Sequence, residues 1–193
     1  MTGQVVTKMQ QLDRMKNRTL KDFNYGGRVY DLSHLHPRIF RFTRPAEGAH
    51  AAEVFDVEVR FTLHCFSRGP RDGEAFDPLS IYPDDYEARI FDFRRYEMSK
   101  RLPEIIQGMP ARKPRHNKSR GNYFSVELVA ENGDVVEYDI FFKVRKPGKG
   151  RLEMIVETAF VRDAGYGSTR PDGKPVRFWI ILHNTRHGLM IRT

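Results

Sequence analysis

The alternation of hydrophobic and polar residues along the chain predicts both strands and helices. Residues 53–66 place apolar side chains at every second position from Phe55 to Cys65, with polar side chains between them. A period of two is typical of a strand with one buried face. Residues 92–110 instead place apolar side chains three and four positions apart, which predicts helix. Asp92 is suited to cap its start, and Pro103 either kinks it or begins a second helix.

Residues 122–184 predict four consecutive strands. The segments "NYFSVELVA" and "VVEYDIFFKVR" flank "ENGD", whose Asn132-Gly133 pair strongly favours a hairpin turn. The segments "GRLEMIVETAFVR" and "KPVRFWIILHN" follow after two further turns or loops. Strands joined in sequence in this way predict an antiparallel meander, and the helical segment before them predicts helices packed on one face.

The first 25 residues predict a one-faced amphipathic helix, because Val5, Met9, Leu12 and Met15 recur at intervals of three or four. The chain is 39% hydrophobic and 30% charged, values typical of a globular protein. We therefore expect one α+β domain over residues 1–193. It contains an N-terminal helix at 1–25, an additional strand at 53–66, a helical segment at 92–110 and a four-stranded antiparallel meander at 122–184.

The formal net charge of +8 points to an anionic partner, of which nucleic acid is the commonest. The segment "ARKPRHNKSRGN" has five cations and no acid, and a second basic cluster follows the second strand of the meander. Such charge beside aromatic residues is typical of a surface that contacts phosphate and bases. We expect nucleic acid, RNA rather than DNA, to contact Arg112, Lys113, Arg115, Lys118, Arg120, Tyr123, Lys146, Lys149 and Arg151.

The single cysteine excludes an intramolecular disulfide and a cysteine-based metal site. His34 and His36 offer two metal ligands, but no third ligand follows at helical or strand spacing, so we expect neither a metal nor a cofactor. The chain has no stretch of about twenty apolar residues and no signal-peptide core. These features predict a cytoplasmic protein with no membrane partner.

Metal-independent cleavage of RNA requires a base for the 2′-hydroxyl, an acid for the leaving oxygen, and cations for the phosphorane. The outward positions of the predicted strands supply these residue types. His64 or His183 is the candidate base or acid, with Glu157 as its partner. The candidates that hold phosphate are Lys143, Arg145 and Arg177. The alternative for each residue is a solvated sheet face, on which Lys–Glu pairs are common.

The order of elements over residues 90–193, helices and then a four-stranded meander, is similar to that of the barnase, EndoU, colicin and RelE group of ribonucleases. This resemblance rests on element order and on no matched motif. It implies a compact endoribonuclease of toxin or phage-related type, with catalytic residues on the open face of the meander.

Two other classes of function stay open. The chain is alternatively a non-enzymatic module that binds nucleic acid or an acidic protein through its basic loops. The open face is alternatively a homodimer or partner interface, with Trp179 and Phe141 as anchors. The sequence also leaves open an inhibitory protein partner.

Overall fold

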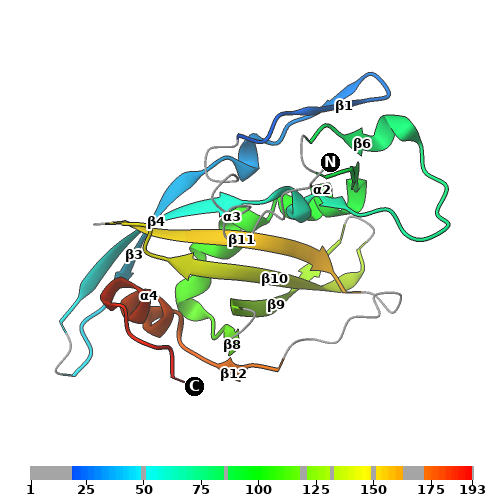
Figure 1. Cartoon of the computed structure of the whole chain (residues 1–193). Coiled ribbons are helices and arrows are strands. Elements are labelled where there is room, and N and C mark those ends of the chain that lie inside the picture. The colour runs from blue at the N-terminus through cyan, green and yellow to red at the C-terminus, as the bar shows by residue number, and fades with distance from the viewer. Residues whose placement is uncertain are drawn as a thin grey trace, which may run out of the picture.

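The largest element of the fold is a mixed sheet with the strand order β12-β8-β9-β10-β11-β4-β3 (Figure 1). The computed structural model describes residues 19–48, 51–84, 87–117, 121–130, 133–148, 151–162 and 172–192. The strands of this sheet are β3 (Arg38–Arg44), β4 (Glu53–Phe61), β8 (Arg115–Asn117), β9 (Gly121–Val129), β10 (Val135–Arg145), β11 (Leu152–Val161) and β12 (Lys174–Pro175).

Three α-helices and two smaller sheets complete the described part of the chain. The helices are α2 (Phe93–Ser99), α3 (Leu102–Gln107) and α4 (Phe178–His187). Short 3-10 helices are η2 (Ser33–Leu35), η3 (Leu63–Cys65), η4 (Pro78–Ser80) and η5 (Met109–Ala111). The smaller sheets comprise β1 (Phe23–Tyr25) with β2 (Arg28–Tyr30), and β5 (Ser67–Arg68) with β7 (Arg89–Phe91) and β6 (Ile81–Tyr82).

The centre of the large sheet joins two distant parts of the sequence. β4 pairs in parallel with β11, so that Phe61 lies opposite Val156, whereas the other neighbouring strands of this sheet are antiparallel. β3 then pairs with the outer side of β4 and forms one edge of the sheet. The predicted additional strand is therefore an integral member of the sheet.

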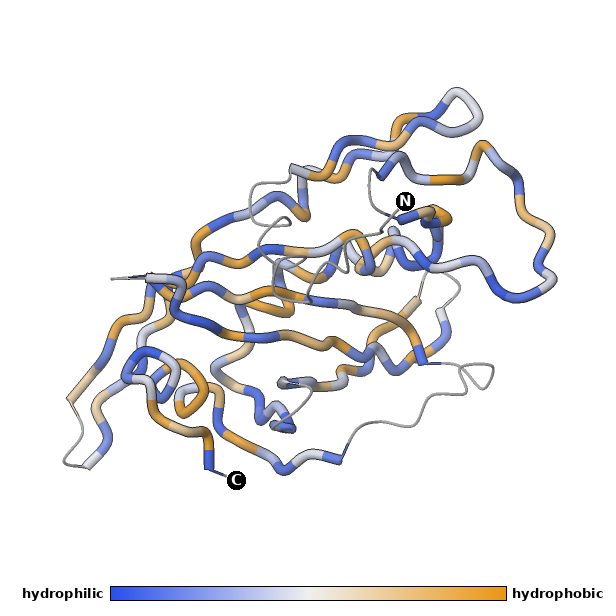
Figure 2. Tube along the Cα trace, in the orientation of Figure 1, coloured by the Kyte–Doolittle hydropathy of each residue, from blue (hydrophilic) through white to orange (hydrophobic). Residues whose placement is uncertain are grey.

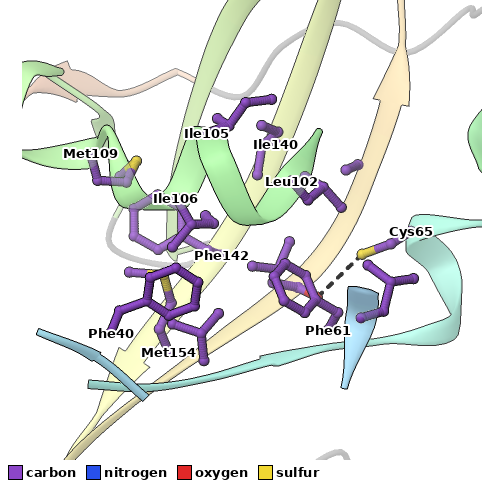
Figure 3. Close-up of a cluster of buried hydrophobic side chains, with 14 of the residues drawn as sticks. Phe40, Phe61, Cys65, Leu102, Ile105, Ile106, Met109, Ile140, Phe142 and Met154 are labelled. Carbon is purple, nitrogen blue, oxygen red and sulfur yellow. Dashed lines mark hydrogen bonds between the residues drawn. The ribbon is translucent and has the colours of Figure 1, made fainter. Parts of the chain in front are cut away.

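The helices α3 and α4 lie on the same face of the sheet. Hydrophobic and hydrophilic residues alternate along the strands (Figure 2), and apolar side chains of the strands and of both helices belong to one core cluster. Leu102, Ile105 and Ile106 of α3 meet Phe142 of β10 and Met154 of β11 in the core (Figure 3). Phe178 of α4 contacts Phe42 of β3, with ring centroids 5.1 Å apart. We keep the name open face for the opposite side of the sheet, although its side chains Tyr123, Glu153 and Phe160 are buried, so the face expected to be bare is only partly exposed.

The predicted four-stranded meander is wrong. Its first three strands are β9, β10 and β11, but the fourth segment contains only the short strand β12 and then the helix α4. Phe178, Ile181 and Leu182 are buried at helical spacing, and Gly188 ends the helix with a left-handed φ of 66°. An apolar run of this length satisfies either period, and burial against β3 and β4 selects the helix. The fold is α+β only in the broad sense.

Other segments also differ from the sequence-based expectation. Residues 1–18 of the expected N-terminal helix lie outside the described residues, and its last three residues form β1. Gly26 and Gly27, with φ of 58° and 76°, turn the chain into β2, which a helix cannot do. The strand predicted over 53–66 ends at Phe61 and continues as η3. The basic segment 111–122 contains the strand β8, and residues 38–44, for which no element was predicted, form the strand β3.

The predicted helical segment forms two short helices, which agrees with the alternative that Pro103 begins a second helix. The Asp92 carboxylate accepts a hydrogen bond from the Arg95 backbone N–H at 3.0 Å, which caps α2. Pro103 lies in the first turn of α3, where its missing N–H has no intrahelical partner to lose. Among the described residues, no helix is long and apolar enough to cross a membrane.

Candidate nucleic-acid interface and predicted catalytic residues

The structure distributes the six candidate catalytic residues over separate places. Lys143 and Glu157 form an ion pair on the open face, where β11 carries a bulge. The register places Phe141 opposite Thr158 and Phe142 opposite Val156, so Glu157 is the extra residue of the bulge. The Lys143 stem also packs on Gly121, where an added Cβ would lie 2.9 Å from the lysine Cγ.

Arg145 belongs to a second, structural network on the open face. Its guanidinium pairs with Glu153, whose side chain is 6% exposed. Arg60 of β4 pairs with the same carboxylate at 3.0 Å and with Glu58 at 2.5 Å. The charge of Arg145 is thus already balanced by a buried carboxylate, and its placement fits the stability of the sheet better than phosphate binding.

His64 lies on η3, apart from the strand positions expected for it. Its Nε2 is 2.8 Å from the Glu87 carboxylate, and Arg89 lies 3.6 Å from the same group. Burial, followed by the charge of Arg89, lowers the pKa of His64, and the hydrogen bond to Glu87 only partly opposes this. The imidazole is therefore neutral at pH 7, the form that a general base requires.

A backbone link joins His64 to the bulge. The Thr62 hydroxyl donates to the Glu157 carbonyl at 2.7 Å and accepts from the His64 N–H at 3.2 Å. The Thr158 hydroxyl donates to the His64 carbonyl at 3.4 Å. The structure thus holds the chain segments of His64 and Glu157 side by side, although each side chain is engaged with a different partner.

Arg177 and His183 lie at the α4 side of the sheet, because the expected fourth strand is a helix. Arg177 is the N-cap residue of α4 and pairs with Glu47 at 3.4 Å, with both side chains exposed. The His183 Nδ1 is 3.1 Å from Glu53 at the start of β4. These two residues do not share the open face with Lys143, so the structure does not bring the predicted set together.

Glu53 gathers basic side chains from two elements, β3 and α4, and no sequence pattern predicted this. Arg44 of β3 lies 3.4 Å from its carboxylate, and Arg186 and His187 of α4 lie at 3.0 and 3.9 Å. Burial acts to raise the pKa of Glu53, but the hydrogen bond from His183 and the charges around it outweigh burial and lower the pKa. The carboxylate is therefore ionised at neutral pH, with its pKa below the ordinary value of 4.5.

The predicted basic loop lies at the edge of the sheet beside a second basic segment. β12 pairs with β8, and the Val176 N–H donates to the Pro114 carbonyl at 2.8 Å. Residues 112–117 and 173–177 consequently run side by side (Figure 1), and we call them the basic edge. Their cations are Arg112, Lys113, Arg115, Lys174 and Arg177.

The cations contributed by the first segment of the basic edge have no acidic partner in the described chain. No described carboxylate lies within ion-pair distance of Arg112, Lys113 or Arg115. Lys113 and Arg115 are exposed, and the half-buried Arg112 guanidinium lies 5.8 Å from the Phe124 ring centroid. Lys174 was not predicted, because sixty residues of sequence separate it from the basic loop.

The remaining predicted contacts are placed as follows. Tyr123 is only 4% exposed and stacks on Phe141 at 5.4 Å, so it supports the sheet from the open face. Lys146 donates to the Arg186 carbonyl at 2.9 Å, and Arg151 is exposed before β11. Lys118, Arg120 and Lys149 lie outside the described residues.

The two residues proposed as dimer anchors are both engaged within the fold. Phe141 stacks between Tyr123 and Phe160, and Trp179 lies on α4 with its ring 6.2 Å from that of Phe55.

The two histidines considered as metal ligands in the sequence, His34 and His36, have protein partners: the His34 ring hydrogen-bonds to Ser99, and the His36 ring to the Leu20 carbonyl. These partners give both histidines a structural role.

Comparison with known proteins gives one match. The family model described as the YjaZ family matches residues 22–186, which spans β1 to the last turn of α4. No curated protein and no solved structure matches the chain. The matched stretch covers most of the sequence, and the chain therefore belongs to the YjaZ family.

Proposed function

We propose that this protein binds RNA through the basic edge. The observation that carries the proposal is the pairing of β8 with β12, which concentrates the cations of two distant segments along one side of the sheet. Lys113 and Arg115 are exposed and have no acidic partner among the described residues, so both are available to phosphate, and the net charge of +8 favours an anionic ligand. Phosphate contacts of this kind position the chain without specifying a sequence.

The test is a fluorescence anisotropy titration of a labelled single-stranded RNA of mixed sequence. If four phosphates are contacted, raising the salt from about 50 to about 200 mM should weaken binding roughly fiftyfold. A single-stranded DNA of the same sequence should bind more weakly. Binding that is absent, or that does not respond to salt, would contradict the proposal, and equal affinity for DNA would broaden the ligand to nucleic acid in general.

A second candidate function is metal-independent cleavage of the bound RNA, and the surroundings of His64 favour it. A neutral imidazole is held by Glu87 at 2.8 Å beside Arg89, and the bulge with Glu157 and Lys143 follows in the neighbouring segment. In this mechanism His64 accepts the 2′-hydroxyl proton, the attacking oxygen forms a bond to phosphorus as the bond to the 5′-oxygen breaks, and the 5′-oxygen takes a proton from water, which leaves a 2′,3′-cyclic phosphate and a 5′-hydroxyl.

Cleavage is tested by incubating RNA with the purified protein in EDTA and analysing the ends of the products. His64→Gln, which retains a polar side chain, should abolish cleavage while leaving binding and thermal stability close to those of the wild type. His36→Gln is the control for loss of an unrelated half-buried histidine. RNA that stays intact with the wild-type protein would exclude cleavage and leave the binding function standing.

A further inference from the structure

The carboxyl-terminal half of α4 presents two histidines toward the first residue of β4. His183 and His187 are four positions apart on the helix, and their ring centroids are 4.5 Å from each other. Side chains at this spacing lie on the same helical face, one turn apart. Glu53 completes the group, and one ligand atom from each of the three residues lies within 4.8 Å of the others.

We propose that Glu53, His183 and His187 form a binding site for a zinc ion. Two imidazole nitrogens and one carboxylate oxygen are a donor set that zinc accepts in three-ligand sites, with the fourth position left to water or another ligand. In a tetrahedral site with ligands at about 2.0 Å, donor atoms lie about 3.3 Å apart. The Glu53–His183 separation of 3.1 Å already matches this spacing, and His187 needs to approach Glu53 from 3.9 Å.

The two arginines paired with Glu53, Arg44 and Arg186, also donate hydrogen bonds to backbone carbonyls, and these bonds can remain when a cation binds the carboxylate. Arg186 donates to the Val54 carbonyl at 2.8 Å, and its guanidinium lies 4.1 Å from the Phe55 ring centroid. Arg44 donates to the Ala51 carbonyl at 3.2 Å. Zinc can therefore replace the two arginines at the carboxylate without leaving either guanidinium unbonded.

Zinc bound at this site would join β4 to α4 and should therefore stabilise the folded state. Glu53 begins β4, and the two histidines lie in the last turns of α4, so that one ion would join elements 130 residues apart in sequence. A ligand that binds only the folded state stabilises it by mass action. The side chain of His187 is 51% exposed, which leaves an approach for the ion from solvent.

The experiment measures zinc binding by the full chain without a polyhistidine tag, by calorimetric titration with zinc chloride and by thermal unfolding with zinc or with EDTA. We expect one zinc per chain and a higher melting temperature with zinc. His187→Ala changes an exposed side chain and should weaken binding roughly a hundredfold or more, as should Glu53→Gln. His36→Ala, which alters a histidine outside the group, should bind zinc as the wild type does.

A further variant separates a metal site from an ordinary ion-pair cluster. Arg186→Gln removes a competitor for Glu53, so zinc should bind more tightly than in the wild type. Cobalt should give the absorption bands of a tetrahedral site in the wild type and lose them in His187→Ala. The proposal is overturned if the wild type binds no stoichiometric zinc, or if His187→Ala and Glu53→Gln bind it as well as the wild type.

Discussion

The two edges of the large sheet differ in whether their cationic side chains are paired with carboxylates. Along β3 and β4, three of the four arginines are matched with carboxylates on the same or the neighbouring strand: Arg41 with Asp56, Arg44 with Glu53, and Arg60 with Glu58 and Glu153. The fourth, Arg38, donates to the Ser33 and His34 carbonyls. Along β8 and β12, the cations of residues 112–115 have no such match among the described residues. Net charge therefore says less about a binding surface than the local pairing of each cation does.

The difference follows from what each edge contacts. The β3–β4 edge is covered by α4 on one face, and Glu53 there is half-buried among groups that would be costly to leave unpaired. The basic edge ends the sheet with two short strands, and Lys113 and Arg115 stay hydrated in solvent. Exposed cations cost little to leave without a carboxylate, which makes them available to an external phosphate.

The largest effect is expected from Glu53→Ala at the paired edge. The substitution leaves Arg44, His183 and Arg186 without their shared carboxylate in a partly buried setting, so the free energy of unfolding should fall by about 2 kcal/mol. Urea denaturation followed by tryptophan fluorescence measures it, because Trp179 lies on α4. A loss no greater than that of Glu47→Ala, which removes an exposed carboxylate, would show that pairing does not stabilise this edge.

The next effect concerns RNA binding at the basic edge. Lys113→Ala combined with Arg115→Ala removes two exposed cations, and RNA affinity should fall about tenfold while thermal stability is unchanged. The slope of log K against log salt should become shallower by about 1.4, as expected for two lost phosphate contacts.

The matched control for that variant is Arg41→Ala combined with Lys100→Ala. It changes the net charge equally, but both cations are exposed and already paired, with Asp56 and Glu97. If this control weakens binding as much as the basic-edge variant does, the ligand responds to total charge, and the contrast between the edges has no functional meaning.

Acid should weaken the paired edge selectively. The pKa of Glu53 is lowered in the folded state from its ordinary value of 4.5, so the unfolded chain binds more protons as the pH falls through this range. The stabilisation by Glu53 is thus complete above about pH 5 and is lost progressively at lower pH. Glu53→Gln should show a smaller loss of stability than the wild type between pH 6 and pH 3, and equal losses would contradict the lowered pKa.

The parts of the fold that the sequence predicted are those set by local spacing. Alternation located β4, β9, β10 and β11, and helical spacing with a capping aspartate located α2 and α3. Local spacing failed for residues 178–187, because an apolar run fits both periods and contact with Phe42 and Phe55 decides between them. Whether a segment forms a strand or a helix was predictable where its apolar residues followed only one of the two spacings.

The sites depend on pairings that no local pattern contains. The parallel contact of β4 with β11 brings Thr62 to Glu157, 95 residues away, and the contact of β12 with β8 adds Lys174 to the basic edge. Glu53 and His183 are 130 residues apart, so a search for a third metal ligand at short spacing could not find this group. Residue types were predictable, whereas their neighbours depended on the sheet order.

The smallest expected effect is a gain in RNA affinity when one further cation of the basic edge is released from its carboxylate. Arg177 belongs to the basic edge but pairs with Glu47 at 3.4 Å, with side chains 62% and 76% exposed. Glu47→Gln frees this arginine and should raise RNA affinity about twofold without changing stability, because exposed pairs contribute little to folding. Glu97→Gln, which frees Lys100 at the carboxyl end of α2, is the matched control and should leave affinity unchanged. An equal gain from both variants would mean that Arg177 does not contact the ligand, and would confine the interface to residues 112–117 and Lys174.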